Sequence, residues 1–148
     1  MRLGWIVVCG AACGTTAPEP EPTVLENSGR ICVASTNPSG GTYFYENEPV
    51  AVQFTMPEGL CFSSSCTRDT SASCAIVTSG ATHHVTTLAQ WTDISAAANA
   101  CTDDCGILSA TCETAEPLPA GDYTFTFGER AIALTIPSQL AERPCVEN

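Results

Sequence analysis

The chain has 148 residues, ten of them cysteine, and its five Arg, no Lys and 16 Asp or Glu give a formal net charge of −11. This length fits one domain of roughly 100–150 residues with a tail. The acidity argues against nucleic acid as a partner, because nucleic acids need a basic surface, and it repels anionic membrane surfaces.

The first twelve residues have the layout of a short export signal. Arg2 supplies one positive charge, residues 3–8 are apolar, and the small residues 10–12 stand directly before Cys13. A positive region, an apolar region and a small-residue cleavage site together define a signal peptide. The apolar run is far shorter than the ~20 residues of a membrane-spanning helix. We therefore assign residues 1–12 to a signal peptide.

The end of this signal resembles the lipobox of bacterial lipoproteins, which is an aliphatic residue, two small residues and the acylated Cys. Ala11, Ala12 and Cys13 match the motif, and Gly10 stands where Leu is usual. The resemblance implies that Cys13 carries the lipid anchor. Gly14, in place of the Asp linked in that family to inner-membrane retention, favours the outer membrane. Cleavage without acylation, which would release a soluble secreted protein, is the alternative.

An acidic, proline-rich segment follows the proposed anchor. Residues 15–23 alternate Pro with Glu and Thr, a composition that favours extended polyproline II and does not pack a core. At ~3.1 Å per residue, residues 14–28 would hold a domain up to about 45 Å from a membrane. We assign residues 13–28 to the lipid-attachment Cys and a linker, and residues 29–148 to one folded domain.

From residue 29 onward, short stretches alternate apolar and polar residues between Gly- and Pro-rich turns, which is typical of half-buried strands. The predicted strands are 30–35, 42–45, 49–56, 73–78, 81–87, 106–112, 123–127 and 131–136. Ser79 and Gly80 predict a two-residue hairpin turn between two of them. Residues 95–100 are the one helix-permissive stretch, where we expect a turn or loop.

Seven or eight short strands over about 120 residues predict an all-β fold, a small disulfide-stabilised antiparallel β-sandwich. Residues 118–123 resemble the tyrosine corner of immunoglobulin-like and fibronectin-like sandwiches. There a Tyr at the start of a late strand, here Tyr123, hydrogen-bonds to the preceding connection. The resemblance implies an immunoglobulin-like architecture. Phe125 stands where antibody domains have a Cys, so their inter-sheet disulfide is not implied.

The cysteines of the domain predict a disulfide framework, because small exported domains are commonly held together in this way. They are Cys32, Cys61, Cys66, Cys74, Cys101, Cys105, Cys112 and Cys145. Eight cysteines allow about a hundred pairings, so the pairing stays open. Their clustering in 61–74 and 101–112 predicts that long loops at one end of the sandwich are linked there.

Several groupings invite a metal or catalytic interpretation, and each has a simpler one. The cysteine spacings are irregular for zinc. The adjacent His83 and His84 would point to opposite faces of a strand, and we expect a surface position on a hairpin for them. Residues 102–104 offer calcium ligands without the spacing of a known calcium loop, which favours a solvated loop tip. Ser63–Ser65 lacks a nucleophile elbow. We therefore predict no metal site, no catalytic residue and no cofactor.

The aromatic residues invite a sugar-binding interpretation. Trp5 falls in the signal, however, and residues 43–45 alternate faces as in an ordinary strand. For Trp91 we expect a place in the core or at a strand edge.

Taken together, the sequence predicts an exported, non-catalytic binding or structural module, similar to cysteine-rich bacterial lipoproteins. Its partners are the membrane, through the lipid on Cys13, and an unidentified protein or glycan, in the periplasm or at the outer membrane. The alternative is a secreted or tethered small-ligand-binding protein, or an enzyme, with its site on the loops.

Overall fold

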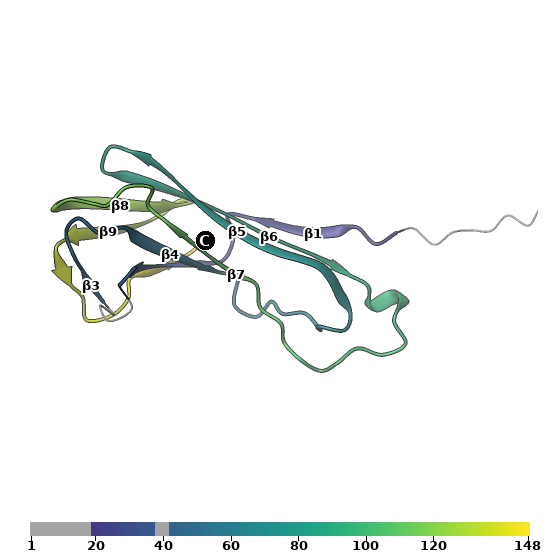
Figure 1. Ribbon diagram of the computed structural model, residues 1–148. Coiled ribbons are helices and arrows are strands. Elements are labelled where there is room, and N and C mark those ends of the chain that lie inside the picture. Colours follow the sequence, from purple (N-terminus) through teal and green to yellow (C-terminus); the bar gives the residue numbers. More distant parts are fainter. Residues whose placement is uncertain (1–18, 38–41) are drawn as a thin grey trace, which may run out of the picture.

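The computed structural model describes residues 19–37 and 42–148, whose regular structure is β apart from one short 3₁₀ helix (Figure 1). The elements are β1 (Pro22–Glu26), β2 (Arg30–Ser35), β3 (Tyr43–Phe44), β4 (Val50–Thr55), β5 (Thr67–Ser79), β6 (Thr82–Asp93), η1 (Ser95–Ala97), β7 (Ser109–Glu113), β8 (Gly121–Phe127), β9 (Arg130–Ile136), β10 (Ser138–Gln139) and β11 (Cys145–Glu147). The all-β prediction is confirmed, and the described residues form eleven strands in place of the expected seven or eight.

The strands form two main sheets, which face each other, and a two-stranded sheet of β3 and β10. The first main sheet is built on β6, which pairs antiparallel with β5 on one side. On its other side, β1 pairs antiparallel with the C-terminal half of β6 and β8 pairs parallel with its start, followed by β9. The second main sheet has the order β11-β2-β4-β7. The molecule is elongated, with η1 at one end and the small sheet at the other (Figure 1).

The core lies between the two main sheets and follows the predicted alternation of side chains. On β4, Val52 and Phe54 are fully buried while Gln53 is exposed. On β8 of the facing sheet, Phe125 and Phe127 are fully buried. Burial of each such side chain stabilises the fold by about 1.5–3 kcal/mol.

Several predicted strands agree closely with the structure. β2 has the predicted bounds, and β4, β8 and β9 differ from them by one or two residues. The predicted hairpin joins β5 and β6, but its two-residue loop is Gly80-Ala81, because Ser79 already pairs with Thr82. Gly80 has φ +61°, a conformation that glycine adopts without steric cost. The helix-permissive stretch forms only the turn-like η1.

The linker assignment is wrong for residues 22–26, which form β1. This strand pairs along its whole length with β6, so the backbone groups that face β6 are satisfied within the sheet. Pro22 is its first residue, a position where the missing N–H of proline is tolerated. The folded part of the chain therefore begins before residue 29. The predicted signal peptide, residues 1–12, and the predicted lipidation site, Cys13, lie outside the described residues.

The hydrogen bond expected from residues 118–123 is present. The Tyr123 hydroxyl donates to the carbonyl oxygen of Pro119 at 2.8 Å. This bond fixes the connection that leads into β8, and so the position at which β8 joins β6.

The disulfide framework is confirmed. The pairs are Cys32–Cys145, Cys61–Cys105, Cys66–Cys101 and Cys74–Cys112, with Cα–Cα distances between 4.1 and 5.5 Å. Two of the four bonds link loops at one end, as expected. The other two join strands: Cys32 lies opposite Cys145 within one sheet, and Cys74 on β5 reaches Cys112 on β7 of the facing sheet. The expectation of loop cysteines is therefore wrong for the 74–112 pair, which closes one side of the sandwich.

Candidate binding pocket at the disulfide-linked end

Two loops that are about forty positions apart in the sequence meet at the end of the molecule near η1. Cys61–Cys105 and Cys66–Cys101 link the loop after β4 to the loop that follows η1. The loops also exchange backbone hydrogen bonds: the Gly106 N–H donates to the Phe62 carbonyl at 2.8 Å, and the Phe62 N–H donates back at 3.3 Å. The two covalent links and this bridge hold the loops as one unit.

This unit presents an aromatic pair. Phe62 and Trp91 stack with ring centroids 6.1 Å apart and an interplanar angle of 29°. Phe62 lies on Gly106, where an added Cβ would come within 2.5 Å of the ring. Trp91 is half-buried on β6 and packs against the hydrophobic core, in agreement with the sequence prediction. Its neighbour Phe62, on a loop between two cysteines, gave no such signal in the sequence.

A pocket of about 210 Å³ opens beside this aromatic pair. It is lined by Cys61, Phe62, Ser63, Cys66, Thr67, Trp91, Asp93, Ser95 and Cys101. Asp93 follows Trp91 by two residues on β6, so both side chains point to the same face. Asp93 is the charged residue among those that line the pocket, and Thr67 pairs with it directly across the sheet.

Local hydrogen bonding keeps Asp93 in its carboxylate form. The backbone N–H of Ser95 donates to Asp93 Oδ1 at 2.8 Å. That bond, followed by one from the Ser95 hydroxyl, lowers the pKa of Asp93 below its usual value. The pocket therefore contains two aromatic rings and an ionised carboxylate at neutral pH.

Residues 102–104 connect the two loops by hydrogen bonds. Asp104 accepts from the Thr102 hydroxyl and from the Ser64 N–H at 3.2 Å, and these bonds lower the pKa of Asp104, the Thr102 bond most. The Ser63 and Thr102 hydroxyls are 2.9 Å apart, and the Thr102 N–H donates to Ser65 Oγ at 2.8 Å. The three serines thus belong to a polar network that holds the loops in place.

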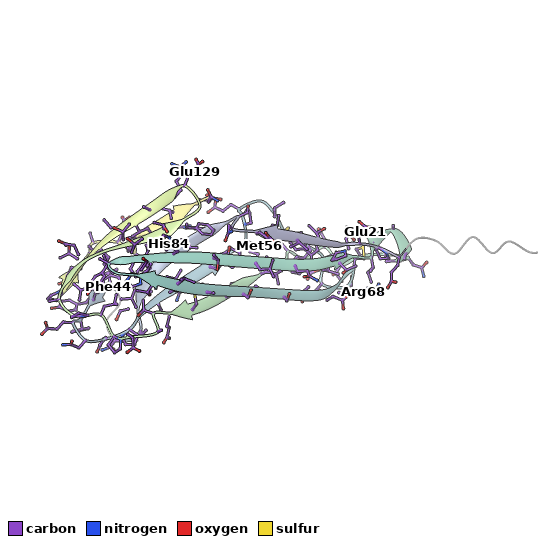
Figure 2. The ribbon with its side chains drawn as sticks, turned by 90° about the horizontal axis from the view of Figure 1, so that it is seen from above. Glu21, Phe44, Met56, Arg68, His84 and Glu129 are labelled. Atoms are coloured by element: carbon purple, nitrogen blue, oxygen red, sulfur yellow. A yellow bond between two sulfur atoms is a disulfide. The ribbon has the colours of Figure 1, made fainter. Side chains whose placement is uncertain are left out.

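The other hollows of the surface lack this combination of groups. One of them, about 440 Å³, is lined by Glu129, Arg130, Glu147 and Asn148, none of which is apolar. Glu129 is well separated from Glu21 and Arg68, which lie toward the disulfide-linked end (Figure 2). Among the described residues, no three His, Cys, Asp or Glu side chains gather as a metal site would require.

His83 and His84 point to opposite faces of β6, as expected, but a surface position is wrong for His83. It is fully buried, with its ring stacked on Phe125 at 4.7 Å between centroids. Its Nδ1 bonds the Thr78 hydroxyl at 2.9 Å, and its Nε2 has no hydrogen-bond partner in the described part of the chain. His84 is exposed and bonds the Thr126 hydroxyl. Position 83 faces inward on β6 and lies against the aromatic core. A neutral imidazole can be buried there.

This burial predicts a pH-dependent stability. Desolvation, and secondly the charge of His84, lower the pKa of His83 below 6.5. The unfolded chain therefore binds a proton on His83 more tightly than the folded chain does. The stabilisation contributed by neutral His83 is present above about pH 6.5 and is lost as the pH falls through the folded-state pKa. We expect the urea midpoint to fall between about pH 7 and pH 5, and to fall less in His83→Phe. An equal change of the urea midpoint with pH in His83→Phe and in wild type would contradict the prediction. His84→Gln, which removes the exposed imidazole, should keep most of this pH dependence.

Comparison of the chain with protein-family models, with curated proteins and with solved structures finds no match. Within residues 19–37 and 42–148 there is no helix with the length and apolar character needed to cross a bilayer. The four disulfides are typical of a protein in an oxidising, exported environment. The geometry of the domain is therefore the basis for a functional proposal.

Proposed function

We propose that this protein is a non-catalytic binding module of the bacterial cell envelope, exported and tethered through a lipid on Cys13. The observation that carries the binding role is the pocket at the disulfide-linked end. Two disulfides and a hydrogen-bonded network hold the loops around Phe62, Trp91 and Asp93. A site fixed in this way loses little conformational freedom when a ligand binds.

The course of the chain supports a tether at the same end of the molecule. Pro22 at the start of β1 lies opposite Thr92, next to the pocket residues Trp91 and Asp93. Before β1, Glu19 forms an ion pair with Arg68 at 3.5 Å. The chain therefore enters the domain beside the pocket, and Figure 2 shows Glu21 and Arg68 at that end.

The strand β1 also shortens the proposed tether. With β1 in the sheet, residues 14–21 join Cys13 to the domain, in place of residues 14–28. Eight residues reach at most about 28 Å. A lipid on Cys13 would thus hold the pocket end toward the membrane, where the module would meet ligands of the envelope.

Replacement of Cys13 tests the tether. We expect Cys13→Ala to move the protein from the membrane fraction to the soluble fraction and to remove the mass of the lipid, because this thiol is the proposed attachment site. Cys9→Ala is the matched control, and it should leave both properties unchanged. Membrane fractionation that persists in Cys13→Ala would contradict the tether, and a soluble, lipid-free wild type would indicate the secreted alternative.

A further inference from the structure

We propose that the pocket beside the stacked pair Phe62 and Trp91 takes a positively charged group, an alkylammonium or guanidinium carried by a partner molecule. This inference rests on the binding role proposed above and is independent of the lipid on Cys13. It names the class of ligand for the pocket, and it follows from the aromatic rings, the charge and the rigidity of the site.

The aromatic rings supply the first attraction. A cation over the face of an aromatic ring is drawn to the negative potential of the ring, and tryptophan is the strongest of the aromatic side chains in this respect. Trp91 and Phe62 both line the pocket, and both are half-buried. Because both rings are half-buried, a cation bound beside them would be partly removed from water, which strengthens the attraction.

The charge of the site supplies the second attraction. Asp93 is ionised and shares the pocket face with Trp91. The nearby guanidinium of Arg68 is already paired, with Glu19 and with Asp69, each at 3.5 Å. Residues 1–12 contain one Arg and no acid, so residues 13–148 carry a formal net charge of −12. The negative electrostatic field of this charge raises the local concentration of cations.

The two disulfides keep these groups in position before binding. Cys61, Cys66 and Cys101 are themselves part of the pocket wall. Cys66 is buried and its backbone carbonyl accepts the Ile94 N–H at 2.8 Å, which fixes the wall to the segment after β6. A pocket of about 210 Å³ fits the head of a side chain or of a small quaternary ammonium, and not an extended molecule.

A neutral sugar ring is the competing occupant, because sugars also stack on tryptophan. The electrostatics favour the cation. A sugar hydroxyl can donate a hydrogen bond to the Asp93 carboxylate, but a neutral ring gains nothing from the net charge of −12, and the Ser63 hydroxyl in the wall is already bonded to Thr102. The experiment must therefore distinguish binding of a sugar from binding of a cation.

Trp91 serves as the reporter in this experiment. The chain has two tryptophans, and Trp5→Phe in the full chain leaves Trp91 as the one source of tryptophan fluorescence. The oxidised protein is titrated with choline, with its uncharged carbon analogue dimethylbutanol and with methyl glucoside, at constant ionic strength. We expect a saturable fluorescence change with choline and a weaker one, or none, with the two neutral compounds.

Two variants test the role of the carboxylate. Asp93→Asn keeps the oxygen that accepts the Ser95 N–H, so the fold is preserved while the charge is removed. We expect it to weaken choline binding about threefold. Glu129→Gln removes one negative charge that lies away from the pocket and should leave the affinity unchanged. No saturable response to choline, an equal response to dimethylbutanol, a preference for the glucoside, or equal weakening by both variants would overturn the proposal. Such a result would leave the membrane tether, tested by Cys13→Ala, untouched.

Discussion

Replacing both Cys32 and Cys145 with serine should lower the free energy of unfolding by about 4 kcal/mol. This bond joins β2 to the last strand, β11, across 113 positions of the chain. Its loss frees the parts of the unfolded chain outside the three remaining bonds, residues 32–61 and 112–145, and this is the main source of the stabilisation in the chain-entropy account. Urea denaturation of the oxidised protein at neutral pH measures the change.

The Cys61–Cys105 pair offers the matched comparison. When both of these are serine, Cys66–Cys101 still closes nearly the same loop, since the two bonds are nested a few positions apart. We therefore expect a smaller loss of about 2–3 kcal/mol. An equal loss in the two double variants, or a larger one at 61–105, would contradict this account of how the bonds stabilise the domain.

Phe125→Ala should cost about 3–5 kcal/mol and lower the melting temperature by roughly 15 °C. Phe125 is fully buried in the core between the sheets, and its ring stacks on the buried His83. Truncation removes apolar contact and leaves a cavity beside an imidazole whose Nε2 has no partner in the described part of the chain. Thermal unfolding followed by circular dichroism measures the loss.

Phe125→Leu is the control for this prediction. It keeps most of the buried volume and should cost less than half as much as the alanine variant. A loss below about 1 kcal/mol in Phe125→Ala would show that the two sheets do not pack around this residue.

The alternation of side chains made much of the sandwich predictable. In β2, β4, β8 and β9, one face enters the core and the other faces solvent, so the apolar residues recur at every second position. Tyr123 in its six-residue context predicted a specific hydrogen bond, which the structure contains. These features depend on local sequence and on a simple inside–outside rule.

β1 and the first half of β5 could not be predicted in this way. In β1 only Leu25 is partly buried, and Val24 is 45% exposed, so the strand shows no alternation. Backbone pairing with β6 holds β1 in the sheet, and this pairing does not produce a pattern of apolar and polar side chains. Residues 67–73 of β5 are similarly exposed, because they extend the hairpin beyond the core.

The candidate pocket was predictable only in part. The spacing of Trp91 and Asp93 on one strand places them on a common face, a signal that the sequence contains. Phe62 joins them only because Cys61 and Cys66 pair with Cys105 and Cys101. Disulfide pairing depends on which loops meet in space, and spacing along the chain does not determine it.

The most direct test of a disulfide-linked, lipid-tethered module is the intact mass of the natively purified protein, alkylated with and without prior reduction. The account predicts a chain that begins at an acylated Cys13, unmodified by alkylation until reduction, after which eight cysteines react. Cysteines that react without reduction, or a mass that begins at Met1 with no lipid, would contradict it.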